Sequence, residues 1–221
     1  MQVMLADPSV FTVEASLRRW WWPVAVVGGL ALGPLDLWGQ VNTPYPWANL
    51  FNSPAVWAAA AFAFGRWVRA RPAAPIGAVI VMMVGVEAYY LAAVLVRDAS
   101  TSTLTSPTAL VWLVGGVMAG LVFGVAGSWA VERSGWRAVL GRAALPAVFA
   151  GEAVRNVVRL ANEPTDGRPD DLGPFALLLA VIGITTLVVL VRDVDRRTGV
   201  RVVAATAAAA LIAGAAMSAT M

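Results

Sequence analysis

The sequence contains no cysteine, no histidine and no lysine, so all sixteen basic residues are arginine. Without cysteine, the chain has no disulfide, no thiol nucleophile and no thiolate metal ligand. Without histidine, imidazole acid–base catalysis and imidazole metal sites are excluded as well. Without lysine, no cofactor can be held as a Schiff base, which excludes retinal. The residues left to carry chemistry are carboxylates, arginine, tyrosine, serine and threonine.

Charged residues are scarce as well. Only 13% of the residues are charged and 59% are hydrophobic, whereas a soluble domain carries about 25% charged residues. The mean hydropathy is +0.73, and the apolar residues form long blocks between short arginine-bearing connections. This pattern is typical of a multi-span membrane protein and does not favour a nucleic-acid partner. We expect one integral membrane domain over residues 1–221, embedded in the lipid bilayer.

The apolar blocks predict an all-α fold, a polytopic membrane bundle of seven transmembrane helices. About 20 helical residues, at 1.5 Å each, cross the roughly 30 Å hydrocarbon core. The predicted spans are roughly 20–38, 54–68, 73–96, 108–131, 143–160, 173–191 and 200–218. The fourth span carries Gly116, Gly120 and Gly124 at four-residue spacing, which predicts a face for close contact with another helix.

The placement of arginine predicts the orientation of these spans. One set of alternate connections contains Arg18, Arg19, Arg66, Arg69, Arg71, Arg133, Arg137, Arg142, Arg192, Arg196, Arg197 and Arg201. By the positive-inside rule, these connections lie in the cytoplasm. We therefore expect a multi-pass protein of the cell membrane with a cytoplasmic N-terminus. After an odd number of spans, the C-terminus is expected outside.

Two acidic residues interrupt the predicted spans, Glu87 in the third and Glu152 in the fifth. An ionisable side chain at mid-bilayer costs roughly 2.5–3.5 kcal/mol, so such residues usually serve a function. Glu87 lies nine residues before Val96 and Glu152 lies eight before Leu160. Both are therefore about 12–13 Å below the outer end of their spans. Because the two carboxyls share one depth, we expect them to meet in one cavity as catalytic residues.

Further polar residues are expected to bind a substrate in that cavity. They are Asp36, Tyr89, Tyr90, Arg155, Asn156 and Arg159. On the fifth span, Glu152, Asn156 and Arg159 follow the spacing i, i+4, i+7 and so share one helix face. Asp36 is placed at the end of the first span, near the outer surface. The alternative interpretation is an internal Glu–Arg network that only locks the helices together.

The outer connection ANEPTDGRPDDLG contains a candidate metal site. Asn162, Asp166 and Asp170 follow a four-residue spacing that resembles the Mg²⁺–diphosphate motif of intramembrane prenyltransferases. In that motif, carboxylate oxygens hold the metal that neutralises the diphosphate. Pro164 and Pro169 break the helix on which the motif normally lies, so a solvated acidic loop is the alternative.

Four segments carry a family resemblance: NSPAVWAAAAFAFG at 52–65, GVEAYY at 85–90, the glycine-rich GGVMAGLVFG, and the GE of GEAVRN. Through them the chain resembles a family of small multi-pass membrane proteins of actinobacteria that has no assigned activity. The chain also resembles the seven-span membrane terpene cyclases, which place a glutamate beside aromatic residues, as Glu87 lies beside Tyr89 and Tyr90. Those cyclases have a second acid in a late span. The last span here has none, so the resemblance implies that Glu152 fills that role.

These observations favour an intramembrane enzyme that acts on an isoprenoid or other lipid-like substrate, concretely a terpene-cyclase-like carbocation cyclisation. A carboxyl desolvated in an apolar cavity can stay protonated at neutral pH and protonate an olefin or epoxide. Aromatic faces then stabilise the cation. Mg²⁺ is expected only for a diphosphate substrate. Two alternatives remain: a small proton-coupled transporter that uses Glu87 and Glu152 as relays, and a non-catalytic membrane scaffold.

Overall fold

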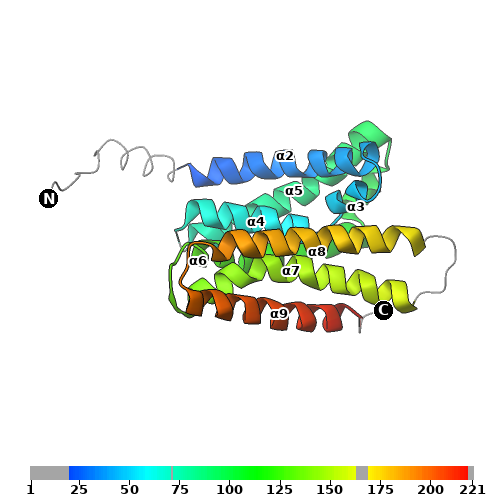
Figure 1. Cartoon of the computed structure of the whole chain (residues 1–221). Helices are drawn as coiled ribbons and strands as arrows, with labels where there is room; N and C mark the ends of the chain where they lie inside the picture. Colours follow the sequence, from blue (N-terminus) through cyan, green and yellow to red (C-terminus); the bar gives the residue numbers. More distant parts are fainter. Residues whose placement is uncertain (1–19, 71, 163–168, 219–221) are drawn as a thin grey trace.

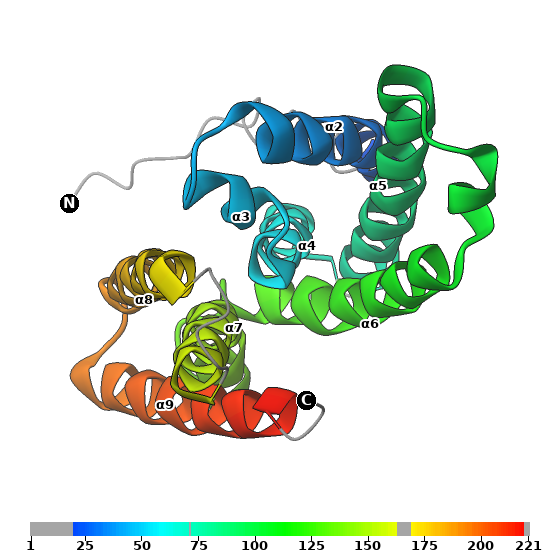
Figure 2. The same ribbon diagram turned by 90° about the vertical axis from the view of Figure 1, so that its right-hand side faces the viewer.

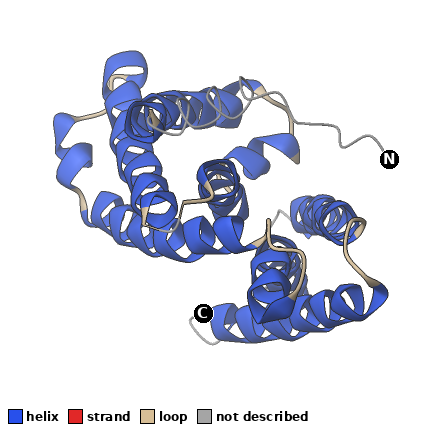
Figure 3. Cartoon of the chain, turned by 90° about the vertical axis from the view of Figure 1, so that its left-hand side faces the viewer, coloured by secondary structure: helices blue, strands red, loops and turns tan. Residues whose placement is uncertain are grey.

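The computed structural model describes residues 20–70, 72–162 and 169–218. Regular structure in these ranges is helical throughout (Figure 3), which confirms the all-α fold class. The α-helices are α2 (Trp21–Asn42), α3 (Trp47–Phe51), α4 (Pro54–Val68), α5 (Ala73–Arg97), α6 (Pro107–Trp129), α7 (Gly135–Asn162), α8 (Pro169–Val191) and α9 (Arg196–Ser218). A short 3₁₀ helix, η1 (Thr101–Thr105), lies between α5 and α6.

Several helices begin where the sequence supplies a cap. Ser106 precedes Pro107 at the start of α6, and the Ser106 hydroxyl accepts the N–H of Ala109 at 3.1 Å. Proline suits this first position because the first N–H groups of a helix have no intrahelical partner. Before α9, Asp195 Oδ1 accepts the N–H of Thr198 at 3.0 Å. The Thr198 hydroxyl donates to Asp195 Oδ2 at 2.7 Å, and this hydrogen bond holds the pKa of Asp195 below its usual value.

The long helices lie side by side along one common direction (Figure 1). Viewed end-on, they form two groups (Figure 2). Helices α2, α4, α5 and α6 form the first group, which we call the cavity region. Helices α7, α8 and α9 form the second, which we call the α7 region because α8 and α9 each pack mainly on α7. The two regions meet where α6 and α4 pack on α7.

Close helix packing in the cavity region depends on glycine. The face predicted from Gly116, Gly120 and Gly124 is confirmed, because all three are buried and face α5. A Cβ atom added at Gly120 would lie 2.6 Å from the Cα atom of Val79, closer than real side chains come. Any larger residue there would therefore push α6 away from α5.

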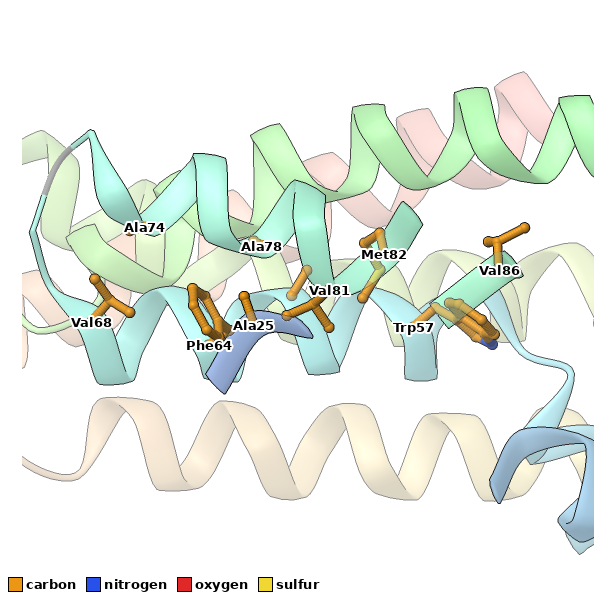
Figure 4. Close-up of a cluster of buried hydrophobic side chains, with 10 residues drawn as sticks. Ala25, Trp57, Phe64, Val68, Ala74, Ala78, Val81, Met82 and Val86 are labelled. Atoms are coloured by element: carbon orange, nitrogen blue, oxygen red, sulfur yellow. The ribbon is translucent and has the colours of Figure 1, made fainter. Parts of the chain in front are cut away.

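The hydrophobic core of the cavity region lies between α2, α4 and α5. Figure 4 shows this cluster, in which Trp57 and Phe64 of α4 lie against Val81, Met82 and Val86 of α5. Met82 is completely buried. A second cluster joins α4 to the α7 region through Ala55, Phe62, Ala126, Ala130, Leu145, Phe149, Ala153, Phe175, Leu179 and Leu190.

Four helical segments in the described ranges are long and apolar enough to cross a membrane: Trp21–Asn42, Ala73–Arg97, Pro107–Trp129 and Leu172–Val191. Their outward faces carry large apolar side chains, such as Leu95 at 72% exposure and Val111 at 71%. A water-soluble protein does not expose so much contiguous apolar surface. The chain therefore has the character of an integral membrane protein. Helix α4, with 15 residues, is only about 22 Å long.

Four helices are longer than the sequence predicts. Helices α8 and α9 each begin four residues earlier than expected, at Pro169 and Arg196. Helix α2 continues to Asn42, whereas the first span was expected to end at 38. Helix α7 begins at Gly135, whereas the fifth span was expected to begin at 143. The prediction followed hydropathy, which falls at polar residues even where the helix continues. As a result, Arg142 does not lie in a connection, as expected, but within α7.

Candidate functional site

The buried face of α2 brings Asp36 against α5. This face consists of Ala25, Gly29, Gly33, Asp36 and Gly39. A Cβ atom at Gly29 would lie 2.7 Å from the carbonyl oxygen of Val81. The backbones of α2 and α5 are in contact here. Asp36 lies on the same face of α2, so its side chain also faces the interior.

Asp36 lies inside the bundle, as expected of a residue that binds a substrate in the cavity. Its residue is only 4% exposed. The indole N–H of Trp57 donates to Oδ1 at 3.2 Å, and the amide of Gln40 donates to Oδ2 at 2.8 Å. The hydroxyl of Tyr89 donates in turn to Gln40 Oε1 at 3.3 Å. One carboxyl is thus positioned by side chains from α2, α4 and α5.

Asp36 lines a cavity of about 220 Å³ within the cavity region. The lining residues are Asp36, Gln40, Asn52, Trp57, Val86, Tyr89, Tyr90, Thr108 and Trp112. They supply one carboxyl, two amides, three hydroxyls and four aromatic side chains, and no basic side chain. A carboxyl among aromatic side chains suits a positive charge, because aromatic rings can attract cations. It does not suit an anion such as a diphosphate.

The structure brings Tyr89 and Tyr90 into this site but not Glu87. Glu87 is exposed and lies on the same outward face of α5 as the exposed Met83 and Leu91. The expected cavity shared by Glu87 and Glu152 is therefore not formed. The two acids were expected to lie at the same depth, but depth along a helix does not determine the direction in which a side chain points.

Glu152 lies in the interior at a different place, where α7 meets the start of α4. Its residue is 4% exposed. Its Oε2 atom accepts the hydroxyl of Ser53 at 2.7 Å and the N–H of Ala55 at 3.1 Å. Asn156, which is also buried, donates its amide to the carbonyl oxygen of Glu152 at 2.8 Å. Glu152 thus caps the N-terminus of α4, a location that the helix dipole favours for a negative charge.

The predicted anion-binding arginines lie outside the Asp36 cavity. Arg155 and Arg159 are partly buried on α7, and Arg155 acts electrostatically on Glu152. Neither residue lines the cavity. Arg155 and Arg159 were expected to bind the substrate because they share α7 with Glu152, which was itself expected in the cavity.

The candidate metal site falls mostly outside the described residues. Asp166 lies in the stretch 163–168, and the side chain of Asp170 is likewise not described. The amide of Asn162 donates to the carbonyl oxygen of Val158 within its own helix at 2.9 Å. Among the described residues, no three acidic, histidine or cysteine side chains gather closely enough to hold a metal ion.

At the opposite end of the bundle, Arg142 connects three segments. Its residue is only 1% exposed. It donates to the carbonyl oxygen of Leu190 at the end of α8, to the carboxylate of Asp193 at 2.7 Å and to the carbonyl oxygen of Glu132 at 3.1 Å. The hydrogen bond from Arg142 holds the pKa of Asp193 below its usual value. The sequence did not predict that Arg142 is buried, because Arg133, Arg137 and Arg142 were all assigned to one connection.

A family of unknown function, DUF6518, matches residues 14–220. The chain belongs to this family. The DUF6518 match includes every helix described above, so the Asp36 cavity lies within the region that defines the family. No curated protein and no solved structure matches the chain. No activity is assigned to the DUF6518 family.

Proposed function

We propose that all seven long helices, α2 and α4 to α9, cross the bilayer, with the N-terminus in the cytoplasm and the C-terminus outside. The distribution of arginine supports this orientation. Arg66, Arg133 and Arg192 lie at or near the ends of α4, α6 and α8, and these ends meet at the same end of the bundle (Figure 1). The positive-inside rule assigns that end to the cytoplasm. The Asp36 cavity then belongs to the outer half of the membrane.

We propose further that the protein is an intramembrane enzyme that converts an isoprenoid or similar lipid-like substrate through a cation held in the Asp36 cavity. One observation supports this proposal most: a buried carboxyl and four aromatic side chains from different helices line the same hollow. Asp36 takes the acid–base role that the sequence suggested for Glu87 and Glu152. Because no basic side chain is among the residues that line the cavity, an olefin or epoxide is favoured over a diphosphate as the reacting group.

The concrete reaction is a cyclisation begun by protonation. The protonated carboxyl of Asp36 gives its proton to one carbon of a double bond, whose π electrons form the new C–H bond. The neighbouring carbon becomes a cation, which the faces of Trp57, Tyr89 and Trp112 stabilise. A second double bond attacks this cation and closes a ring. The product cation then loses a proton to the carboxylate, which restores the acid and makes the net reaction an isomerisation.

The test uses purified protein in lipid nanodiscs with a panel of isoprenoid olefins and epoxides in heavy water. We expect an isomeric product that carries deuterium, because the carboxyl proton exchanges with solvent. Asp36→Asn should reduce turnover by about 10²-fold or more while the protein still folds. Glu87→Gln is the matched control, and its turnover should equal that of the wild type. If Asp36→Asn retains full turnover, or if the substrate is only carried across the membrane, the enzymatic proposal fails.

A further inference from the structure

A second, smaller hollow adjoins the Asp36 cavity. It measures about 100 Å³, and we call it the apolar chamber. It is lined by Pro54, Trp57, Met82, Val86, Trp112, Gly115, Gly116 and Ala119. Trp57, Val86 and Trp112 line both spaces, so the cavity and the chamber share these three side chains as their common wall. The other residues that line the chamber have no side chain that donates or accepts a conventional hydrogen bond.

Gly115 of α6 is one of the residues that line the chamber, and it has no side chain. Gly115 is exposed, and a Cβ atom added there would meet no other atom within 4 Å. Around it, α6 exposes Val111, Val114 and Met118. This apolar surface belongs to one of the helices suited to cross a membrane. The chamber therefore borders lipid at Gly115 and not water.

The volume of the Asp36 cavity decides how much of a lipid it can hold. At about 220 Å³, it is smaller than the roughly 300–1,000 Å³ of sites that enclose drug-sized ligands. A small polar or reactive group fits beside Asp36, but a whole lipid chain does not. The rest of a lipid-like substrate must leave the cavity, and the apolar chamber lies directly next to it.

We propose that the substrate is a single-chain amphiphile with an uncharged or cationic end, which enters sideways from the bilayer between α4 and α6. Its polar or reactive end lies beside Asp36. Its chain passes the wall formed by Trp57 and Trp112, lies in the apolar chamber and reaches the lipid at Gly115. This inference rests on the proposed function, because it assigns the substrate to the same carboxyl.

Quaternary ammonium probes test this route because they mimic a cation with and without a chain. Tetramethylammonium, octyltrimethylammonium and the anionic octyl sulfate would be titrated into the protein in nanodiscs, with binding measured by calorimetry. We expect both cations to bind and octyl sulfate not to bind at the cavity. Gly115→Leu places a side chain at the mouth of the chamber, so the octyl probe should bind at least about tenfold more weakly. Tetramethylammonium binding should not change.

Two further variants separate the possible failures. Val114→Leu adds the same kind of side chain to the exposed face of α6 outside the chamber, and both cations should bind it as they bind the wild type. Ala119→Leu narrows the chamber from inside and should repeat the effect of Gly115→Leu. If both chamber variants bind the octyl probe normally, the lateral route is wrong while the proposed function stands. If Asp36→Asn binds both cations normally, the cationic end does not lie beside Asp36 and this inference is wrong, whereas the turnover of Asp36→Asn decides the proposed function.

Discussion

The cavity region and the α7 region both bury charged side chains, but they use them differently. In the cavity region, the oxygens of Asp36 accept hydrogen bonds from side chains around a hollow. In the α7 region, Glu152 accepts the N–H of Ala55 at the start of α4. Arg142 donates to the carbonyl oxygen of Leu190 near the end of α8. Glu152 and Arg142 thus form hydrogen bonds with backbone groups at helix ends, whereas the hydrogen bonds of Asp36 are with side chains.

This difference separates structural charges from candidate functional ones. A negative charge at a helix N-terminus and a positive charge at a C-terminus are stabilised by the helix dipole and by unpaired backbone groups. Glu152 and Arg142 each fit that description. A carboxylate has about four positions where it can accept a hydrogen bond, and Asp36 uses two of them on protein donors. The remaining capacity of Asp36 is available to a ligand in the cavity.

The largest effect is expected from Arg142→Leu. The substitution leaves the carbonyl oxygens of Leu190 and Glu132 without their donor in the interior. The free energy of unfolding should fall by about 3 kcal/mol, since unpaired buried groups cost about 1–3 kcal/mol each. Arg133→Leu makes the same change at an exposed position nearby and should cost less than about 0.5 kcal/mol. Thermal unfolding in detergent measures both, and equal stabilities would remove the structural role of Arg142.

A smaller loss is expected from Glu152→Leu. Without its acceptor, the N–H of Ala55 and the hydroxyl of Ser53 stay unpaired at the start of α4, at a cost of about 2 kcal/mol. Glu87→Leu is the matched control, because it removes the same charge from the outward face of α5. That variant should be at least as stable as the wild type if α5 faces lipid. Should Glu152→Leu unfold like the wild type and lose turnover, Glu152 belongs with Asp36 after all.

The smallest effect concerns the pH dependence of the contact between Arg142 and Asp193. The pKa of Asp193 is lowered in the folded protein from its ordinary value of 3.8. The stabilisation is therefore complete above about pH 4 and is lost as the pH falls through the lower folded value. Because the Asp193 side chain is 56% exposed, the contribution should stay below about 1 kcal/mol. The melting temperatures of the wild type and Asp193→Asn should differ at about pH 6, and the difference should shrink as the pH falls below about 4.

The positions of the helices could be predicted from the sequence because long apolar blocks dominate it. The predicted span 54–68 coincides with α4, and the span 73–96 differs from α5 by one residue. Errors arose where a polar residue lies within a helix. Asp36 and Arg142 lower the local hydropathy, yet both lie inside longer helices. Hydropathy measures the preference for lipid and not the continuity of the backbone, so it ended the first span too early and began the fifth span too late.

The candidate site was predicted only in part. Asp36, Tyr89 and Tyr90 were expected to bind the substrate, and all three line the cavity. Glu87 was expected there as well because of its depth. The residues at four-residue spacing around Glu87 are large and apolar, which indicates a face towards lipid. The residues around Asp36 on its face are alanine and glycine, which indicates close helix contact. Trp57 and Trp112 could not be linked to Asp36 without the packing of α4 and α6.

The hydrogen bonds of Glu152 also bear on how the protein is made. Helices α2 to α6 leave the ribosome before α7, so the chain can assemble the cavity region first. At that stage Ser53 and the N–H of Ala55 still lack their acceptor, which comes from α7. Asn52 and Trp57, on either side of these two residues, line the cavity. The Asp36 cavity is therefore expected to reach its final shape only when α7 has packed against the start of α4, so that the second half of the chain completes a site in the first half.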